Sequence, residues 1–188
     1  MNLHLSWDLF ILVFFALVTA YSFIIGRNQT LKIILGTYVA ILCADAIGNL
    51  FSKSLLTSQT FLKMLSLFSV GNEDQAVIFF KVLILIVLVV LVAVRGLFIV
   101  EADDNRPVTI RIIILLLLGV LSAGLMLSAV LVFVSGGTLI GGILPENNFL
   151  VTVANSSRMV KIMVDYANFW FFLPGLAFVV LGIFHKKA

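Results

Sequence analysis

The sequence predicts an all-α membrane protein, a polytopic bundle of four to five transmembrane helices with two amphipathic helices at the membrane surface. Of its 188 residues, 62% are hydrophobic and only 11% are charged, whereas a soluble domain needs about 25% charged residues to cover its surface. The apolar residues gather in runs long enough to cross about 30 Å of hydrocarbon, which requires about 20 helical residues. We therefore expect one integral membrane domain over residues 1–188.

Five apolar runs are candidate spans. They cover residues 9–25, 31–51, 76–100, 110–134 and 169–184. The first has no Lys or Arg before it and no small-residue cleavage site after it, so we expect a retained span and not a removed signal peptide. The fifth is shorter and contains Pro174, which predicts either a kinked span or a re-entrant element.

Two connecting segments, residues 55–69 and 150–166, have amphipathic helical patterns. Each carries its apolar residues on one helical face and polar residues on the other. The apolar faces consist of Phe61, Met64, Leu65 and Phe68 in the first segment and Met159, Val160, Met163, Val164 and Ala167 at the second. Such helices lie in the membrane interface. Here they would either contact a partner or join spans while covering apolar protein surface.

The basic residues predict the orientation. With the N-terminus outside, the inner side receives Arg27, Lys32, Arg95, Arg106, Arg111, Lys186 and Lys187, and the outer side receives Lys53, Lys63, Lys81, Arg158 and Lys161. This excess on one side favours an outside N-terminus and an inside C-terminus. The net charge of +3 includes no basic run, so we expect no nucleic-acid partner.

Small residues predict where helices approach closely. They recur at four-residue spacing, which forms a flat strip on one helical face and allows close packing inside a membrane. The second run contains Gly36, Ala40, Ala44 and Gly48, and the fourth contains the pairs Gly119–Ala123 and Gly124–Ser128. We expect the fourth run to lie in the interior and the third, which is Leu, Ile and Val almost all round, to face lipid. Besides membrane lipids, the expected partners are further copies of this chain or another membrane protein.

One acid, Asp45, lies beside the strip of the second run. A charge in hydrocarbon costs roughly 2.5–3.5 kcal/mol, so it normally faces protein or water. Helical periodicity places Asp45 near Tyr38 and Asn49. Lys81 enters the membrane from the same side if the second and third runs are antiparallel. Asp45 would then pair with Lys81, or Lys81 would extend to the interface while Asp45 accepts hydrogen bonds from Tyr38 or another helix.

The chemistry of an enzyme is missing from the sequence. His4 and His185 lie near opposite ends of the chain, Cys43 is the single cysteine, and no serine has an elbow motif or an interior base. A metal centre or a nucleophilic site needs clustered partners of these types. We expect no catalytic activity, no bound metal and no cofactor.

The order of features resembles the bacterial colicin V production protein family over roughly residues 6–166. The resemblance rests on Asp8, Gly26, Gly36 with Ala40 and Ala44, Gly119 and Gly124, and the Ser-led segment 155–158. The family usually has four spans and an Asp-Arg followed by Gly. Here Asp104 and Arg106 are separated, Pro107 follows, and a fifth run is added. The resemblance implies an inner-membrane protein linked to envelope homeostasis and export of a peptide toxin, without a defined catalytic or transport mechanism.

Two functions remain as expectations. The first is a scaffold or accessory subunit in envelope homeostasis or peptide toxin export. The second is a small ion- or proton-linked transporter or channel that uses the polar seam of Asp45, Tyr38, Asn49 and Lys81. A transporter would bury several ionisable groups at mid-membrane, and the scarcity of such groups favours the scaffold.

Overall fold

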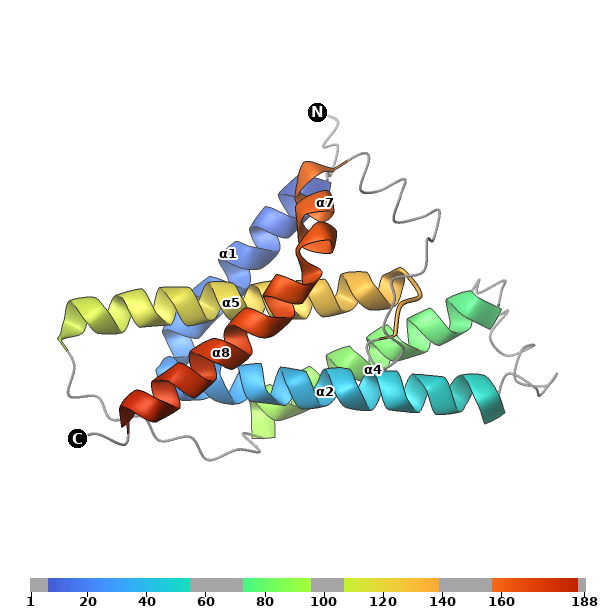
Figure 1. Ribbon diagram of the computed structural model, residues 1–188, viewed down its shortest axis with the longest axis horizontal. Coiled ribbons are helices and arrows are strands. Elements are labelled where there is room, and N and C mark those ends of the chain that lie inside the picture. The colour runs from blue at the N-terminus through green and yellow to red at the C-terminus, as the bar shows by residue number, and fades with distance from the viewer. Residues whose placement is uncertain (1–6, 55–72, 96–106, 139–156, 186–188) are drawn as a thin grey trace.

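The computed structural model describes residues 7–54, 73–95, 107–138 and 157–185. These residues form six helices (Figure 1): α1 (Trp7–Ile25), α2 (Arg27–Ser54), α4 (Glu73–Arg95), α5 (Val108–Val134), α7 (Arg158–Asp165) and α8 (Ala167–His185). By length and apolar composition four of them suffice to cross a membrane, or five if the bent pair of α7 and α8 counts as one span. The predicted all-α polytopic bundle is confirmed. The predicted surface helix at 55–69 and the first part of the one at 150–166 lie outside the described residues.

A single glycine joins α1 to α2. Gly26 has a φ of +80°, a left-handed conformation that favours glycine and reverses the chain in one residue. The Thr30 hydroxyl donates a hydrogen bond to the Gly26 carbonyl at 2.9 Å. As a result α2 begins at Arg27, earlier than the predicted start at residue 31, because the polar residues after the turn are already helical.

The central helix is α5. Buried residues make up 61% of its most apolar 18-residue window, against 17% in α4 and 11% in α1. It packs against α1, α2, α4, α7 and α8. Its end is closed by Gly136, whose φ is +77° and whose N–H bonds to the Phe133 carbonyl, as in other helices that end on a left-handed glycine. The fourth run is therefore interior and the third is mostly exposed, as predicted.

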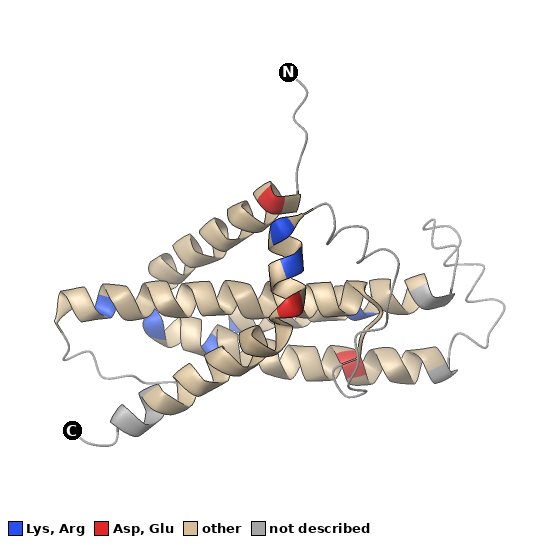
Figure 2. Cartoon of the chain, turned by 45° about the horizontal axis from the view of Figure 1, so that its top comes forward, with Lys and Arg blue, Asp and Glu red and all other residues tan. Residues whose placement is uncertain are grey.

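The outer faces of the bundle are apolar. Exposed residues include Leu17, Ile24, Leu42, Leu50, Val94 and Leu117. A soluble protein rarely exposes such a surface, and a lipid environment covers it without cost. Most charged side chains lie near the helix ends, while Asp45 and Lys81 lie farther in (Figure 2).

The last two helices form a bent pair. An angle of 63° separates α7 from the following helix, and Figure 1 shows α7 beside the beginning of α1. α7 buries Val160 and Met163 and exposes Arg158 and Lys161, so it has the predicted amphipathic faces. The fifth run begins at Ala167, two residues before the predicted start, because its first turn follows the bend directly.

Candidate functional site

The small-residue strip of α2 packs against α4. A Cβ added at Gly36 would overlap Val92, and one added at Gly48 would overlap the side chain of Lys81. Between these glycines, Ala40 and Ala44 are buried. The backbones therefore approach closely along the whole strip, which holds two helices of the same chain together.

An ion pair joins the two helices beside this strip. Lys81 Nζ lies 2.7 Å from Asp45 Oδ1, and the side chains are 4% and 0% exposed. The absence of a Cβ at Gly48 gives room for the aliphatic part of Lys81 to lie across α2. Lys81 is thus directed inward to the carboxylate and does not extend to the interface.

The ion pair lies toward one end of the bundle. The Lys81 ammonium is 5.7 Å from the centroid of the Phe133 ring, and Phe133 belongs to the last turn of α5. Along α2, Asp45 lies about 14 Å from Ser54 at the helical rise of 1.5 Å per residue. The pair is therefore buried in protein near the level at which α5 ends, away from the middle of the bundle.

Tyr38 does not belong to this site, and its predicted place near Asp45 is wrong. Two helical turns separate the residues, about 10 Å along the axis, so a shared direction does not bring them into contact. The Tyr38 hydroxyl instead donates to the Phe171 carbonyl and accepts from the Gly175 N–H at 2.9 Å. Asn49 is half-buried one turn beyond Asp45.

The small residues of α5 contact two other helices. A Cβ at Gly119 would lie 3.1 Å from Thr19 Cα of α1, and one at Gly124 would overlap the ring of Trp170 of α8. Ala123 lies between these contacts and Ser128 lies one turn after Gly124, and both are buried. The predicted packing residues of the fourth run therefore hold α1 and α8 against the central helix.

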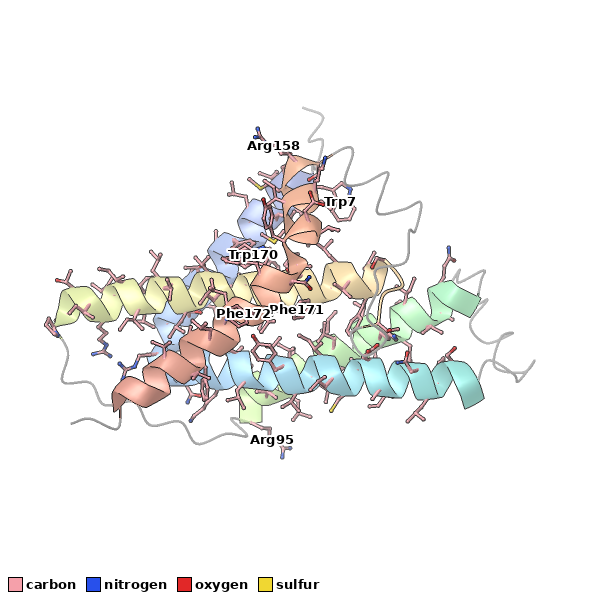
Figure 3. The ribbon with its side chains drawn as sticks, in the orientation of Figure 1. Trp7, Arg95, Arg158, Trp170, Phe171 and Phe172 are labelled. Carbon is pink, nitrogen blue, oxygen red and sulfur yellow. The ribbon has the colours of Figure 1, made fainter. Side chains whose placement is uncertain are left out.

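The aromatic residues Trp7, Tyr166 and Trp170, near the starts of α1 and α8, divide into two groups. Trp7 and Tyr166 are exposed, as interfacial residues are. Trp170 lies where α8 crosses α5 (Figure 3), and its ring is 5.8 Å from that of Phe15. Close approach at Gly124 makes room for this indole inside the bundle, which hydropathy alone does not reveal.

A contact at the start of α7 was not predicted from the sequence. The Ser157 hydroxyl donates to Asp8 Oδ1 at 2.6 Å, and the Met159 N–H donates to the same oxygen at 3.0 Å. Ser157 also accepts from the Val160 N–H. A serine before an amphipathic run signals a helix start, but no local signal links it to Asp8.

The described residues contain no group of three or more His, Cys, Asp and Glu that could hold a metal ion. Asp45 and Lys81 are groups of opposite charge that the structure brings together inside the bundle, and what they can do is hold two helices or exchange a proton. Comparison with protein families, curated proteins and solved structures finds no match for this chain.

Proposed function

We propose that this chain is a bacterial inner-membrane scaffold or accessory subunit of the colicin V production type, serving envelope homeostasis or peptide toxin export. The resemblance described above supplies the cellular setting. The observation that supports a scaffold role is the closed Asp45–Lys81 contact. Its two charges neutralise each other beside the small-residue contact of α2 with α4, where they fix the register of the two helices.

The energetics of a buried ion pair agree with this role. Removing one partner from such a pair costs about 3–5 kcal/mol, because the other charge stays buried without compensation, whereas replacing both by apolar groups is often neutral. A pair that serves only to align helices should therefore tolerate joint replacement. A pair that carries protons should not, because the titrating groups themselves perform the function.

The same pair favours the second candidate, a proton-linked transporter. Transfer of a proton from the ammonium to the carboxylate would leave two neutral groups, and alternation between these states is one way to couple a proton to movement. Ionisable groups inside membranes mark such pathways. The position of the pair near the end of α5 makes it less suited to a path across the whole bilayer.

The proposed partners are further copies of this chain or another membrane protein. The α2 strip contacts α4 within the chain, so association would use the exposed apolar faces of α1, α4 and α8 instead.

The test compares wild type with Asp45→Asn, Lys81→Met and the double variant in mild detergent and in proteoliposomes. For a scaffold we expect each single variant to lose about 3–5 kcal/mol of stability and the double variant to recover most of this loss. We also expect the proton flux of proteoliposomes with wild type or any variant to equal that of liposomes without protein. Stability is measured by thermal unfolding and proton flux by an enclosed pH-sensitive dye.

Single variants that fold like wild type, together with a wild-type proton flux that both variants abolish, would contradict the scaffold and support the transporter. Ala46→Val is a matched control, since Ala46 lies on the exposed face of the same helix and should change neither stability nor flux.

A further inference from the structure

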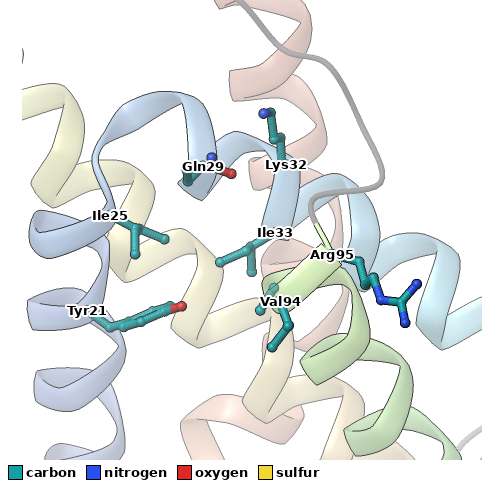
Figure 4. A pocket seen from close by; sticks show the side chains of 8 residues that line it. Tyr21, Ile25, Gln29, Lys32, Ile33, Val94 and Arg95 are labelled. Carbon is teal, nitrogen blue, oxygen red and sulfur yellow. The ribbon is translucent and has the colours of Figure 1, made fainter.

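A cavity of about 450 Å³ opens between the end of α1, the beginning of α2 and the end of α4 (Figure 4). Its apolar lining includes Ile25, Ile33 and Val94. The Tyr21 side chain points into the space between the helices, while Lys32 and Arg95 extend outward at its margin (Figure 4). The cavity therefore has an apolar part and a basic margin.

The charged residues in the described helical turns around the cavity are basic. Arg27, Lys32, Arg95 and Arg111 lie in these turns, and the described residues of the turns include no Asp or Glu. Of the four, Lys32 and Arg95 line the cavity. Helix dipoles do not add to this charge, because the positive end of α2 meets the negative ends of α1 and α4 here. An anion in the cavity therefore meets Lys32 and Arg95 and, among the residues that line it, no opposing carboxylate.

If α1, α2 and α4 each cross the membrane, the cavity lies toward its surface, where lipid headgroups are found. Three helix ends surround it, and the surfaces beside it are apolar, since Ile24 is 83% and Val94 is 78% exposed. A ligand that fits must carry a negative group toward the helix ends and apolar groups toward the membrane interior. Basic pockets between transmembrane helices at the membrane surface bind the headgroups of anionic phospholipids in this way.

We propose that this cavity binds an anionic phospholipid. Its phosphate lies near Lys32 and Arg95, its glycerol region near Tyr21 and Gln29, and its acyl chains along the exposed apolar surface of Ile24 and Val94. This site is separate from the Asp45–Lys81 pair, which lies toward the other end of α2 and α4, and it does not depend on the proposed scaffold role.

Native mass spectrometry of the full chain in mild detergent tests the proposal. Phosphatidylglycerol is compared with phosphatidylcholine of the same acyl chains. We expect wild type to retain phosphatidylglycerol at least tenfold better. The Lys32→Gln/Arg95→Gln variant should lose at least tenfold of this retention, because each basic residue near an anionic surface contributes about 1 kcal/mol.

The matched control is Arg158→Gln/Lys161→Gln, which removes the same charge from exposed positions on α7, away from the cavity. It should retain phosphatidylglycerol within twofold of wild type. Ala93→Trp fills the cavity, which Ala93 also lines, without changing any charge, and should abolish the preference. This variant decides the matter if the charge variant does not fold.

Three results would overturn the proposal. Equal retention of phosphatidylglycerol and phosphatidylcholine would mean that the site does not distinguish an anionic headgroup from a zwitterionic one. Unchanged retention in both cavity variants would place the lipid elsewhere. Displacement of phosphatidylglycerol by soluble glycerol phosphate at similar concentration would identify a free phosphate ester, and not a lipid, as the ligand.

Discussion

The Tyr38 hydroxyl of α2 forms hydrogen bonds with backbone groups of another helix, α8. Pro174 lies inside α8, where a proline removes a backbone donor and its ring disturbs the preceding turn. Tyr38 of α2 bridges the backbone there, since it accepts from the Gly175 N–H and donates to the Phe171 carbonyl. Inside a membrane such groups have no water to turn to, so this contact lets α8 continue past the proline.

Replacing Tyr38 by Phe should therefore destabilise α8 more than its loss of one hydroxyl suggests. Two backbone groups lose their partner in an apolar environment, which costs about 1–3 kcal/mol for each buried group left unsatisfied. We expect a lower unfolding temperature in detergent and faster amide exchange at residues 171–178, measured by hydrogen exchange with mass spectrometry.

The control for this prediction is Tyr166→Phe, because Tyr166 is 61% exposed and its variant should behave as wild type. In the Tyr38→Phe background, Pro174→Ala should restore much of the stability, since a regular helix would re-form its own hydrogen bonds. Independent, additive effects of the two substitutions would refute the bridging role.

At the level of single residues, the contacts that could be predicted from the sequence are those that helical periodicity determines. Two outcomes were expected for Asp45 and Lys81, an ion pair or a Lys81 that extends to the interface, because both residues enter the membrane from the same side if the helices are antiparallel. The structure places the two side chains 2.7 Å apart. Tyr38 projects from the same side of α2 as Asp45 but lies two turns away along the helix axis. Helical periodicity gives the direction of a side chain and not its position along the axis. The contacts of Tyr38 with α8 and of Asp8 with Ser157 join residues more than a hundred positions apart, and they depend on how whole helices cross.

At the level of helices, hydropathy predicts that a helix exists and whether it lies in the interior better than it predicts the residues at which the helix begins and ends. The central place of α5 follows from its small residues, which admit Thr19 and Trp170 at Gly119 and Gly124. The early start of α2 depends on the backbone of Gly26, and the bend before α8 depends on the docking of α7. Neither has an apolar periodicity that would reveal it.

The docking of α7 rests on its first turn. An eight-residue helix is too short to be stable alone, and Asp8 of α1 accepts hydrogen bonds from both Ser157 and Met159 there. Asp8→Ala should free this turn, because the Ser157 hydroxyl and the Met159 N–H lose their shared acceptor. We expect about tenfold faster amide exchange in α7, measured by hydrogen exchange, with α2 and α4 unchanged.

Asp165→Asn serves as the control, because Asp165 is exposed at the other end of α7 and should leave exchange unaltered. Ser157→Ala should also speed exchange in α7, since it removes the hydroxyl bond to Asp8 and the acceptor of the Val160 N–H. If exchange in α7 stays slow in both variants, the apolar contacts of Val160 and Met163 hold the helix without the cap.

The molecule as a whole has two chemically different ends. The beginning of α1, the end of α5 and α7 share one end, where Asp8, Arg158, Lys161 and Asp165 mix both charges. The opposite end holds the cavity and its basic residues. Since basic residues concentrate on the cytoplasmic side, this asymmetry supports the proposed outside N-terminus, an orientation in which the proposed lipid site would lie in the inner leaflet.

This orientation predicts which positions a membrane-impermeant thiol reagent reaches. In a Cys43→Ser background, Arg158→Cys should react in intact spheroplasts, whereas Arg95→Cys should react only after permeabilisation, because Arg158 lies beside the beginning of α1, where the Met159 N–H bonds to Asp8, and Arg95 lines the cavity at the end of α1. Lys186→Cys adds the fate of the last helix: labelling that matches Arg95→Cys means that α8 crosses and the chain has five spans. If Lys186→Cys is instead labelled in intact spheroplasts, as Arg158→Cys is, α7 and α8 form a re-entrant element. If Arg95→Cys reacts in intact spheroplasts and Arg158→Cys reacts only after permeabilisation, the N-terminus lies in the cytoplasm and the basic cavity in the outer leaflet.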